Sequence, residues 1–304
     1  MSPDRRLWLL GCGMAAVAAI LFATKGVLIK LALNAGADAT ALLAVRMGIS
    51  LPCFALAAWW YGRGRTALSH REAGLVIILG LVGFHLASWL DVQGLRFIGV
   101  ALERVVLYIY PPVVVLLGWL LGRGRPGAVL TAACLVTWLG VGVSCLDQPL
   151  HGDHLALGVA LVAGSALAYA VHLVGIEPLM RAHGGARVAA LGFCAAGVGV
   201  LIHAAVAVPA GIWAVQPREL WTLGALLAIV GTVIPGLLAG AAISRLGAGP
   251  SAVIGTLGPG VTVLLAWAWL GEAPTACTWS GLGLTVAGGL AVSLGGPRAS
   301  ARAR

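Results

Sequence analysis

Apolar runs of about 20 residues fill almost the whole chain, and they most constrain what it can fold into. A helix of about 20 residues crosses the roughly 30 Å hydrocarbon core of a bilayer. The runs lack the alternation of apolar and polar residues that membrane-spanning strands need. Of the 304 residues, 60% are hydrophobic and 10% are charged, whereas a soluble domain carries roughly 25% charge. The sequence therefore predicts an all-α integral membrane protein.

We predict ten transmembrane helices, the first and seventh of which are long enough to tilt or break. Their expected ranges are 8–32, 39–60, 73–93, 99–121, 127–146, 155–177, 187–213, 220–243, 249–270 and 275–295. The longest gaps, 61–72 and 147–154, are too short for a domain outside the bilayer. Lys25 and Lys30 are the only lysines, and neither lies in a nucleotide-binding P-loop motif. We therefore expect no enzyme, no cofactor and no metal site.

Arginines gather on one side of the predicted topology. If the N-terminus is inside, the inner segments hold thirteen arginines and the outer loops hold two, Arg96 and Arg218. The inner ones are Arg5, Arg6, Arg63, Arg65, Arg71, Arg123, Arg125, Arg181, Arg187, Arg245, Arg298, Arg302 and Arg304. Because cytoplasmic loops are enriched in arginine, this bias predicts cytoplasmic termini. The net charge of +9 then reflects topology and contact with anionic lipid, and we expect no nucleic acid as a partner.

The segments 99–146 and 247–294 repeat one pattern at a shift of 148 positions. The matches that composition explains least are two prolines, a tryptophan and two glycines. They pair Pro111 with Pro259, Pro126 with Pro274, Trp119 with Trp267, Gly99 with Gly247 and Gly140 with Gly288. At a shift of 147 the earlier parts also match weakly, and Lys25 then faces His172.

Five spans in each half make the second copy start on the opposite side of the membrane. We therefore predict two inverted five-helix repeats, residues 1–148 and 149–304. Inverted repeats of this kind are the usual build of secondary transporters.

The second copy also resembles a known family. Gly247-Ala248 leads into Pro259 and then into Trp269-Leu270-Gly271-Glu272-Ala273-Pro274, a pattern similar to the EamA-like type of the drug/metabolite transporter superfamily. In the first half Tyr110-Pro111-Pro112, and earlier Lys30 followed by Ala44-Val45-Arg46, resemble the same pattern. The resemblance implies a ten-helix exporter of amino acids or other small metabolites. The first copy departs from it at Arg123, where the pattern expects an acid, so that acid's role does not extend to Arg123.

Ionisable side chains inside the spans are the candidate functional residues, since each costs about 2.5 kcal/mol or more at the bilayer centre unless paired or hydrated. Glu103 and Arg104 begin the fourth predicted helix, and Tyr108 shares a face with Arg104. Arg104 can bind a substrate carboxylate, and Glu103 can bind an amine or a coupling proton. The alternative is an internal pair that holds this helix in place.

Histidines beside aromatic residues form a second group of candidates. His85 and Trp89 share a face of the third predicted helix, and Tyr169 and His172 share one of the sixth. A histidine titrates near neutral pH, so these residues can couple transport to protons. The alternative is a hydrogen-bonded packing role, which we favour for His203.

Lys25 and Arg46 are candidates for charge pairing or coupling. For Arg46 we expect a structural pairing with Asp91 or Glu103 rather than a substrate contact. Lys30 and Asp91 lie near the outer ends of their spans, where the side chains can reach the interface.

Prolines and glycines mark the expected gates and contact points. Pro111, Pro235 and Pro259 remove backbone donors from the fourth, eighth and ninth helices and are the expected gating positions. Small residues make the ninth helix thin and let its neighbours approach closely. The glycines expected to be helix contact points are Gly140, Gly142, Gly288 and Gly289.

These observations together favour a secondary transporter of the cell inner membrane, an exporter of small amphipathic metabolites such as amino acids that works by alternating access. We expect helices 1, 3, 4, 6, 8 and 9 to line its cavity. The expected substrate-binding residues are His85, Trp89, Arg104, Tyr108, Tyr169 and His172. The expected partners are the solute, the lipid bilayer and protons, with the protein a monomer or homodimer. The alternative is a membrane-embedded flippase for a lipid carrier, or an enzyme acting on lipid-linked substrates.

Overall fold

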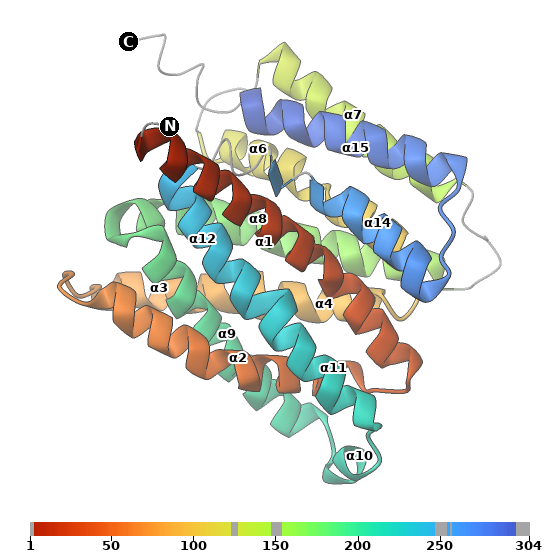
Figure 1. Cartoon of the computed structure of the whole chain (residues 1–304), viewed down its shortest axis with the longest axis horizontal. Coiled ribbons are helices and arrows are strands. Elements are labelled where there is room, and N and C mark those ends of the chain that lie inside the picture. The colour runs from red at the N-terminus through yellow and green to blue at the C-terminus, as the bar shows by residue number, and fades with distance from the viewer. Residues whose placement is uncertain (1–2, 123–126, 147–153, 247–253, 256, 296–304) are drawn as a thin grey trace.

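The chain folds into a bundle of long helices whose axes follow one common direction (Figure 1). The computed structural model describes residues 3–122, 127–146, 154–246, 254–255 and 257–295, and these contain helices and no strand. The all-helical fold class is therefore confirmed.

Sixteen helical elements make up the described part of the bundle, and two of them, labelled η, are π-helical. They are α1 (Pro3–Asn34), α2 (Ala39–Gly62), α3 (His70–Gly80), η1 (Leu81–Leu86), α4 (Ala87–Gly94), α5 (Val100–Leu107), α6 (Tyr110–Leu120), α7 (Ala128–Cys145), α8 (Leu155–His183), α9 (Gly185–Ala207), α10 (Ala210–Ala214), α11 (Arg218–Ala228), η2 (Ile229–Val233), α12 (Ile234–Leu246), α14 (Leu257–Leu270) and α15 (Ala276–Gly295).

Several of these elements join into segments that can cross a membrane. Within the described residues, 7 segments are long and apolar enough: Trp8–Asn34, Ala39–Gly62, His70–Gly94, Val100–Leu120, Leu155–His183, Gly185–Ala207 and Arg218–Ala242. Thr131–Cys145 and Leu257–Leu270 are shorter apolar helices, and α15 is a further helix of 20 residues. The chain is thus a multi-pass membrane protein, while ten spans remains a prediction.

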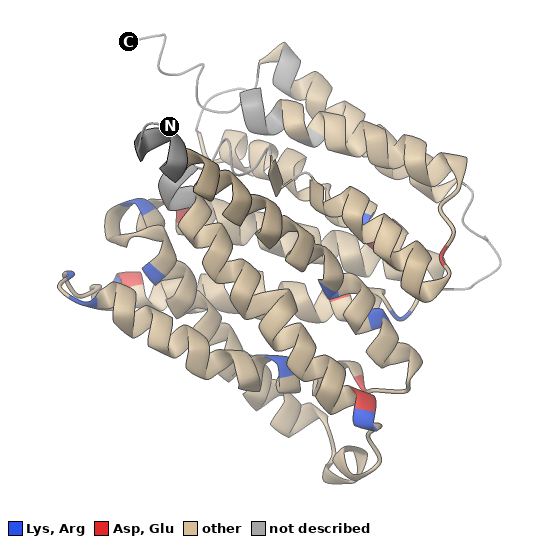
Figure 2. Cartoon of the chain, in the orientation of Figure 1, with Lys and Arg blue, Asp and Glu red and all other residues tan. Residues whose placement is uncertain are grey.

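The bundle has two ends, which differ in charge. We call the end of the bundle at which α1 begins and α15 ends the terminal end. The α1–α2 and α4–α5 connections lie at the opposite end, which we call the far end (Figure 1). Charged residues are sparse along the helices between them (Figure 2). By the helix ends that they flank, Arg63, Arg65 and Arg187 belong to the terminal end, and Arg96 and Arg218 to the far end.

Proline lies at two of the helix breaks, and the sequence predicted the one at Pro111. The fourth predicted span divides where α5 ends at Leu107 and α6 begins at Tyr110, with Pro111 in the first turn of α6. A proline in the first turn costs little, because the amide it lacks has no intrahelical acceptor there. The seventh predicted span divides at Pro209, between α9 and α10. The first span does not divide, and α1 runs unbroken.

Two other spans are interrupted by π-helical turns rather than by sharp breaks. The amide of Ala87 at the end of η1 donates to the carbonyl of Val82, five residues back. The amide of Ile234 at the end of η2 donates in the same way to Ile229. Pro235, where the sequence predicted a break, is the second residue of α12, two positions after the end of η2. The turn at η1 was not predicted.

Glycines bring α7 and α15 into backbone contact. A Cβ atom at Gly140 would lie 2.6 Å from the carbonyl oxygen of Gly281, and one at Gly288 would lie 2.6 Å from that of Ala133. The expected contact role is therefore confirmed for Gly140 and Gly288. It is wrong for Gly142, whose added Cβ would meet no atom within 4 Å, because that side of α7 faces away from α15. The side chain position of Gly289 lies outside the described part.

Leucine at position 140 should therefore destabilise the bundle, since overpacking typically costs about 1–3 kcal/mol or more. We expect Gly140→Leu to lower the thermal unfolding midpoint of the purified protein in detergent. The matched control is Gly142→Leu, two residues away on the same helix, which should leave the midpoint unchanged. Equal midpoints for the two variants would contradict the packing described here.

Candidate functional site

A buried ion pair joins α1 to α4 inside the bundle. The Lys25 Nζ donates to the Asp91 Oδ2 at 2.7 Å, and the side chains are 18% and 2% exposed. Asp91 lies within one turn of the end of α4, so the pair is near the far end. Asp91 was expected to reach the interface, and this is wrong because Lys25 holds its carboxylate inside.

Three more ionisable side chains surround this pair, and we call the five together the charged cluster. Glu103 in the first turn of α5 is buried, and its Oε2 lies 3.9 Å from the Arg104 Nε. The Arg104 and Arg46 guanidiniums both act electrostatically on Asp91, and the Glu103 carboxyl lies beside it. The α1 backbone allows this approach at Gly26, where an added Cβ would lie 3.2 Å from the Glu103 Oε2.

Arg46 does not form the predicted ion pair with Asp91 or Glu103. Its Nε instead donates to the Thr232 Oγ1 in η2, at 2.8 Å. Asp91 is already paired with Lys25, and a hydroxyl from the second half of the chain accepts one of the hydrogen bonds that the Arg46 guanidinium can donate. The sequence did not indicate Thr232 as the partner of Arg46, because threonine carries no charge.

The charged cluster keeps donors and acceptors without partners. Those among its buried atoms are the Arg46 Nη1, the Arg104 Nε and Nη2, the Asp91 Oδ1 and both carboxylate oxygens of Glu103. Buried polar groups in proteins nearly always have a hydrogen-bond partner. The arrangement can therefore bind water or a solute that carries both donors and acceptors.

His85, Trp89 and His203 form a second group. The His85 Nε2 and the His203 Nδ1 are 3.0 Å apart, a hydrogen bond in which one ring donates. The Trp89 ring lies 5.8 Å from the His203 ring, and the buried Trp89 Nε1 has no partner. His203 was assigned to packing alone because no aromatic residue lies one turn away on its own helix. Its aromatic neighbour lies on α4 instead.

A row of aromatic rings includes the remaining predicted residues. Tyr108 lies 6.0 Å from Tyr110, Tyr110 lies 5.3 Å from Tyr169, and Tyr169 stacks 6.1 Å from His172. The row continues from His172 through Phe84, Phe193 and Phe54. It therefore crosses from the α5–α6 break to α2, and Tyr110 joins Tyr108 and Tyr169 although the sequence did not place it in the site.

The α5–α6 break also meets the other predicted half. The Tyr108 hydroxyl donates to the carbonyl of Gly255 at 3.4 Å. The third predicted gating proline, Pro259, is buried near the start of α14. Residues 247–253 and 256, which the sequence assigned to the same thin helix, lie outside the described residues.

Glu272 and Lys30 fix the connection between α4 and α5, which carry Asp91 and Glu103. The Glu272 carboxylate accepts from the amides of Val100 and Ala101, at 2.8 and 3.3 Å, and so caps the start of α5. The Lys30 Nζ donates to the carbonyls of Leu95 and Ile98, at 2.6 and 2.9 Å. Sequence reasoning left the Glu272 acid without a role and expected Lys30 only to reach the interface.

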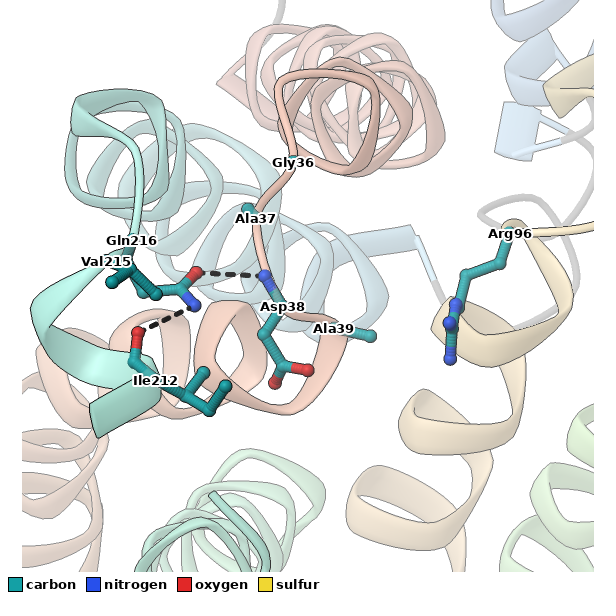
Figure 3. A pocket seen from close by; sticks show the side chains of 8 residues that line it. All are labelled: Gly36, Ala37, Asp38, Ala39, Arg96, Ile212, Val215 and Gln216. Atoms are coloured by element: carbon teal, nitrogen blue, oxygen red, sulfur yellow. Dashed lines mark hydrogen bonds between the residues drawn. The ribbon is translucent and has the colours of Figure 1, made fainter. Parts of the chain in front are cut away.

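A hollow of about 330 Å³ opens at the far end. Its lining residues are Gly36, Ala37, Asp38, Ala39, Arg96, Ile212, Val215 and Gln216. The Gln216 Oε1 accepts from the Asp38 amide at 2.9 Å, and Arg96 lies across the hollow from Asp38 (Figure 3). The Asp38 Oδ1 accepts from the amides of Thr40 and Ala41, and so caps α2.

The described residues hold no group of three or more His, Cys, Asp or Glu side chains placed to bind a metal ion. The chemistry available inside the bundle is therefore that of charge pairs, imidazoles and aromatic rings. These groups suit reversible binding of a polar solute.

Comparison with known proteins identifies the family of this chain. The model of the EamA-like transporter family matches residues 9–146 and, a second time, residues 156–294. The chain belongs to the EamA-like transporter family. The family domain is thus present twice, and the resemblance to the drug/metabolite transporter superfamily is confirmed.

Individual relatives support the EamA-like assignment. The "Uncharacterized transporter YcbK" of Bacillus subtilis (strain 168) is 28% identical over 241 residues, which are 76% of each chain. A solved crystal structure of a protein with 18% sequence identity covers 92% of this chain and 95% of its own, with a TM-score of 0.64, and that likeness concerns the fold alone. This EamA-like protein is therefore a membrane transporter rather than an enzyme.

The Lys25–Asp91 pair should make a large contribution to the stability of this EamA-like chain. Removing one partner of a buried pair costs about 3–5 kcal/mol, because the other charge stays buried without a partner. We expect Asp91→Asn to lower stability by about this amount in unfolding experiments in detergent, and the double variant Lys25→Met, Asp91→Asn to recover most of it.

The exposed pair between Arg181 and Glu177 on α8 supplies the control. Exposed ion pairs contribute only about 0–1 kcal/mol, so Glu177→Gln should have little effect. Independent, additive effects of the Lys25 and Asp91 substitutions would contradict the pairing.

Proposed function

We propose that this protein exports small amphipathic metabolites that carry both an anionic and a cationic group, such as amino acids, across the cell inner membrane. The observation that carries the proposal is the charged cluster, in which the Arg104 guanidinium and the Glu103 carboxyl lie side by side and buried, and the Arg104 Nε and Nη2 have no hydrogen-bond partner.

The two groups can bind the two ends of a zwitterion. The Arg104 guanidinium offers a planar donor pair that suits a carboxylate. Glu103 offers two carboxylate oxygens to an ammonium group. A solute that presents both groups would satisfy donors and acceptors that the protein leaves open.

Charge balance favours a solute with a carboxylate. The charged cluster holds three basic side chains, Lys25, Arg46 and Arg104, against the two acids Asp91 and Glu103. One positive charge is left without a counter-charge when all five are ionised. An uncompensated charge inside a bundle is costly, and a solute carboxylate placed beside Arg104 would offset part of that cost.

The aromatic row and the histidine pair would contribute the apolar contacts and the coupling. Tyr108 and Tyr169 offer ring faces to the apolar part of a solute. The hydrogen-bonded pair of His85 and His203 is suited to hold or pass a proton. We propose proton coupling at this pair, with Trp89 beside it.

Transport would follow alternating access between the two predicted repeats, residues 1–148 and 149–304. The positions of Pro111, Pro235 and Pro259 are the proposed bending points. The arginines of the terminal end support a cytoplasmic location for both termini. In this orientation the hollow beside Asp38 faces away from the cytoplasm and would serve as the exit of an exporter.

Substitution of Arg104 and Glu103 tests the site. Truncating one partner of a buried charge pair costs about 2–5 kcal/mol, so Arg104→Gln should weaken binding of an amino acid about 30-fold or more. Glu103→Gln should weaken binding of the amino acid but leave binding of its deaminated carboxylic acid unchanged. Thermal-shift titration over an amino-acid panel, followed by transport in proteoliposomes, measures both.

Arg181→Gln, which alters an exposed arginine on α8, is the matched control and should retain affinity and transport. Unchanged affinity and transport in both the Arg104 and Glu103 variants would exclude the site. A thermal shift produced by a polyprenyl lipid carrier and by no amino acid would favour the lipid-flippase alternative instead.

A further inference from the structure

The two π-helical turns occupy equivalent positions in the repeat. The turn η1 begins at Leu81 and η2 begins at Ile229, which are 148 positions apart, the offset of the internal repeat. Each contains a glycine at its third position, Gly83 and Gly231. Well under 1% of residues in globular proteins are π-helical, and such turns are frequent at functional sites. A matched pair therefore indicates a shared role.

The carbonyl two residues before each π turn accepts a hydrogen bond from a side chain. The Leu79 carbonyl accepts from the Nδ1 of His172 on α8, at 2.7 Å. The Leu227 carbonyl accepts from the Oγ1 of Thr232 at 2.9 Å. Leu79 and Leu227 are again 148 positions apart. A π turn interrupts the regular ladder of an α-helix, and these side chains supply partners at the interruption.

Each π turn is also hydrogen-bonded to the opposite half of the chain, η1 directly by His172 and η2 by Arg46 through Thr232. His172 belongs to α8 in the second half, and η1 belongs to the first. Thr232 lies in η2, and its Oγ1 accepts from the Nε of Arg46, which belongs to α2 in the first half. We call the His172–Leu79 contact and the Arg46–Thr232–Leu227 contacts the two latches.

Each π-turn glycine also packs against the first helix of the opposite half. An added Cβ at Gly83 would collide with the His172 side chain, with the Nδ1 at 2.6 Å. An added Cβ at Gly231 would lie 3.7 Å from the Cα of Lys25 on α1. Lys25 and His172 match in the weak alignment of the two halves, so the two contacts are equivalent as well.

A chain of contacts connects the two turns. The turn η1 leads directly into α4, which carries Asp91, and Asp91 pairs with Lys25. The backbone of Lys25 packs on Gly231 of η2, next to Thr232 and hence Arg46. A change in one turn therefore displaces groups that touch the other.

We propose that η1 and η2 are paired hinges of the alternating-access cycle, and that the two latches hold the conformation described here. The inference rests on the proposed transport function. A π turn that returns to α-helical form rotates and shifts everything beyond it, which would move Asp91 relative to Lys25. In this role His172 is a positioning residue that holds a hinge, rather than a substrate ligand.

Distance measurements between spin labels test the hinges without knowledge of the solute. Labels at Arg96→Cys and Val215→Cys, on opposite sides of the far-end hollow, are introduced into a background without the native cysteines and measured in lipid nanodiscs. We expect two distance populations in this background, one of them matching the structure described here. The loss of one hydrogen bond should change the ratio of the two populations about fivefold to tenfold, which the distance measurement can detect.

The latch variants remove the hydrogen bonds at similar side-chain size. Thr232→Val and His172→Leu should each deplete the population that matches this structure about fivefold to tenfold. Thr232→Ser and His172→Asn, which keep a donor in place, should restore it. Thr222→Val on α11, whose hydroxyl donates to carbonyls of its own helix, is the control and should change nothing.

Unchanged populations in both Thr232→Val and His172→Leu would overturn the hinge inference while leaving the transport proposal intact. A single population already in the unsubstituted background would overturn alternating access, and the hinges with it. If His172→Leu fails to fold, the Thr232 pair of variants decides the result alone.

Discussion

The Lys25–Asp91 ion pair is the interaction on which the rest of the interior depends. Neither charge is tolerable alone at this depth, so α1 and α4 must meet where they do. That meeting brings Gly26 against Glu103 and Arg104 of α5, where the Arg104 Nε and Nη2 are buried without hydrogen-bond partners. The proposed solute site thus lies next to a pair that is itself fully occupied. The need to pair a buried charge fixes the geometry of α1 and α4, and the neighbouring charged side chains are positioned by it.

The internal repeat explains the packing of helices far apart in the sequence. Gly140 and Gly288 are 148 positions apart, and each brings the backbone of α7 or α15 against the other. The π turns follow the same offset, as do the carbonyls of Leu79 and Leu227. The latches, however, differ chemically: an imidazole serves one turn, and a hydroxyl with a guanidinium serves the other. The duplicated backbone is therefore shared by the halves, while their side chains have separate tasks.

Much of this fold could be predicted from the sequence, because span length, proline and repeated glycine act locally. The division of the fourth span beside Pro111 and the glycine contact at Gly140 follow from such rules. The partners of Arg46 and His203 could not be predicted, since Thr232 carries no charge and Trp89 lies on another helix. The turn at η1 has no proline to mark it. Only the match of Gly83 with Gly231 in the repeat could have indicated it.

Glu272 has a consequence for the chemistry of its neighbour Glu103. An acid in the first turn of a helix ordinarily turns back to the free amides of its own helix. Here the amides of Val100 and Ala101 are already taken by Glu272 from the other family domain. Glu103 is thereby released from capping, and its carboxylate faces the interior. Glu272 neutralises the positive end of α5, and Glu103 is left free of that role.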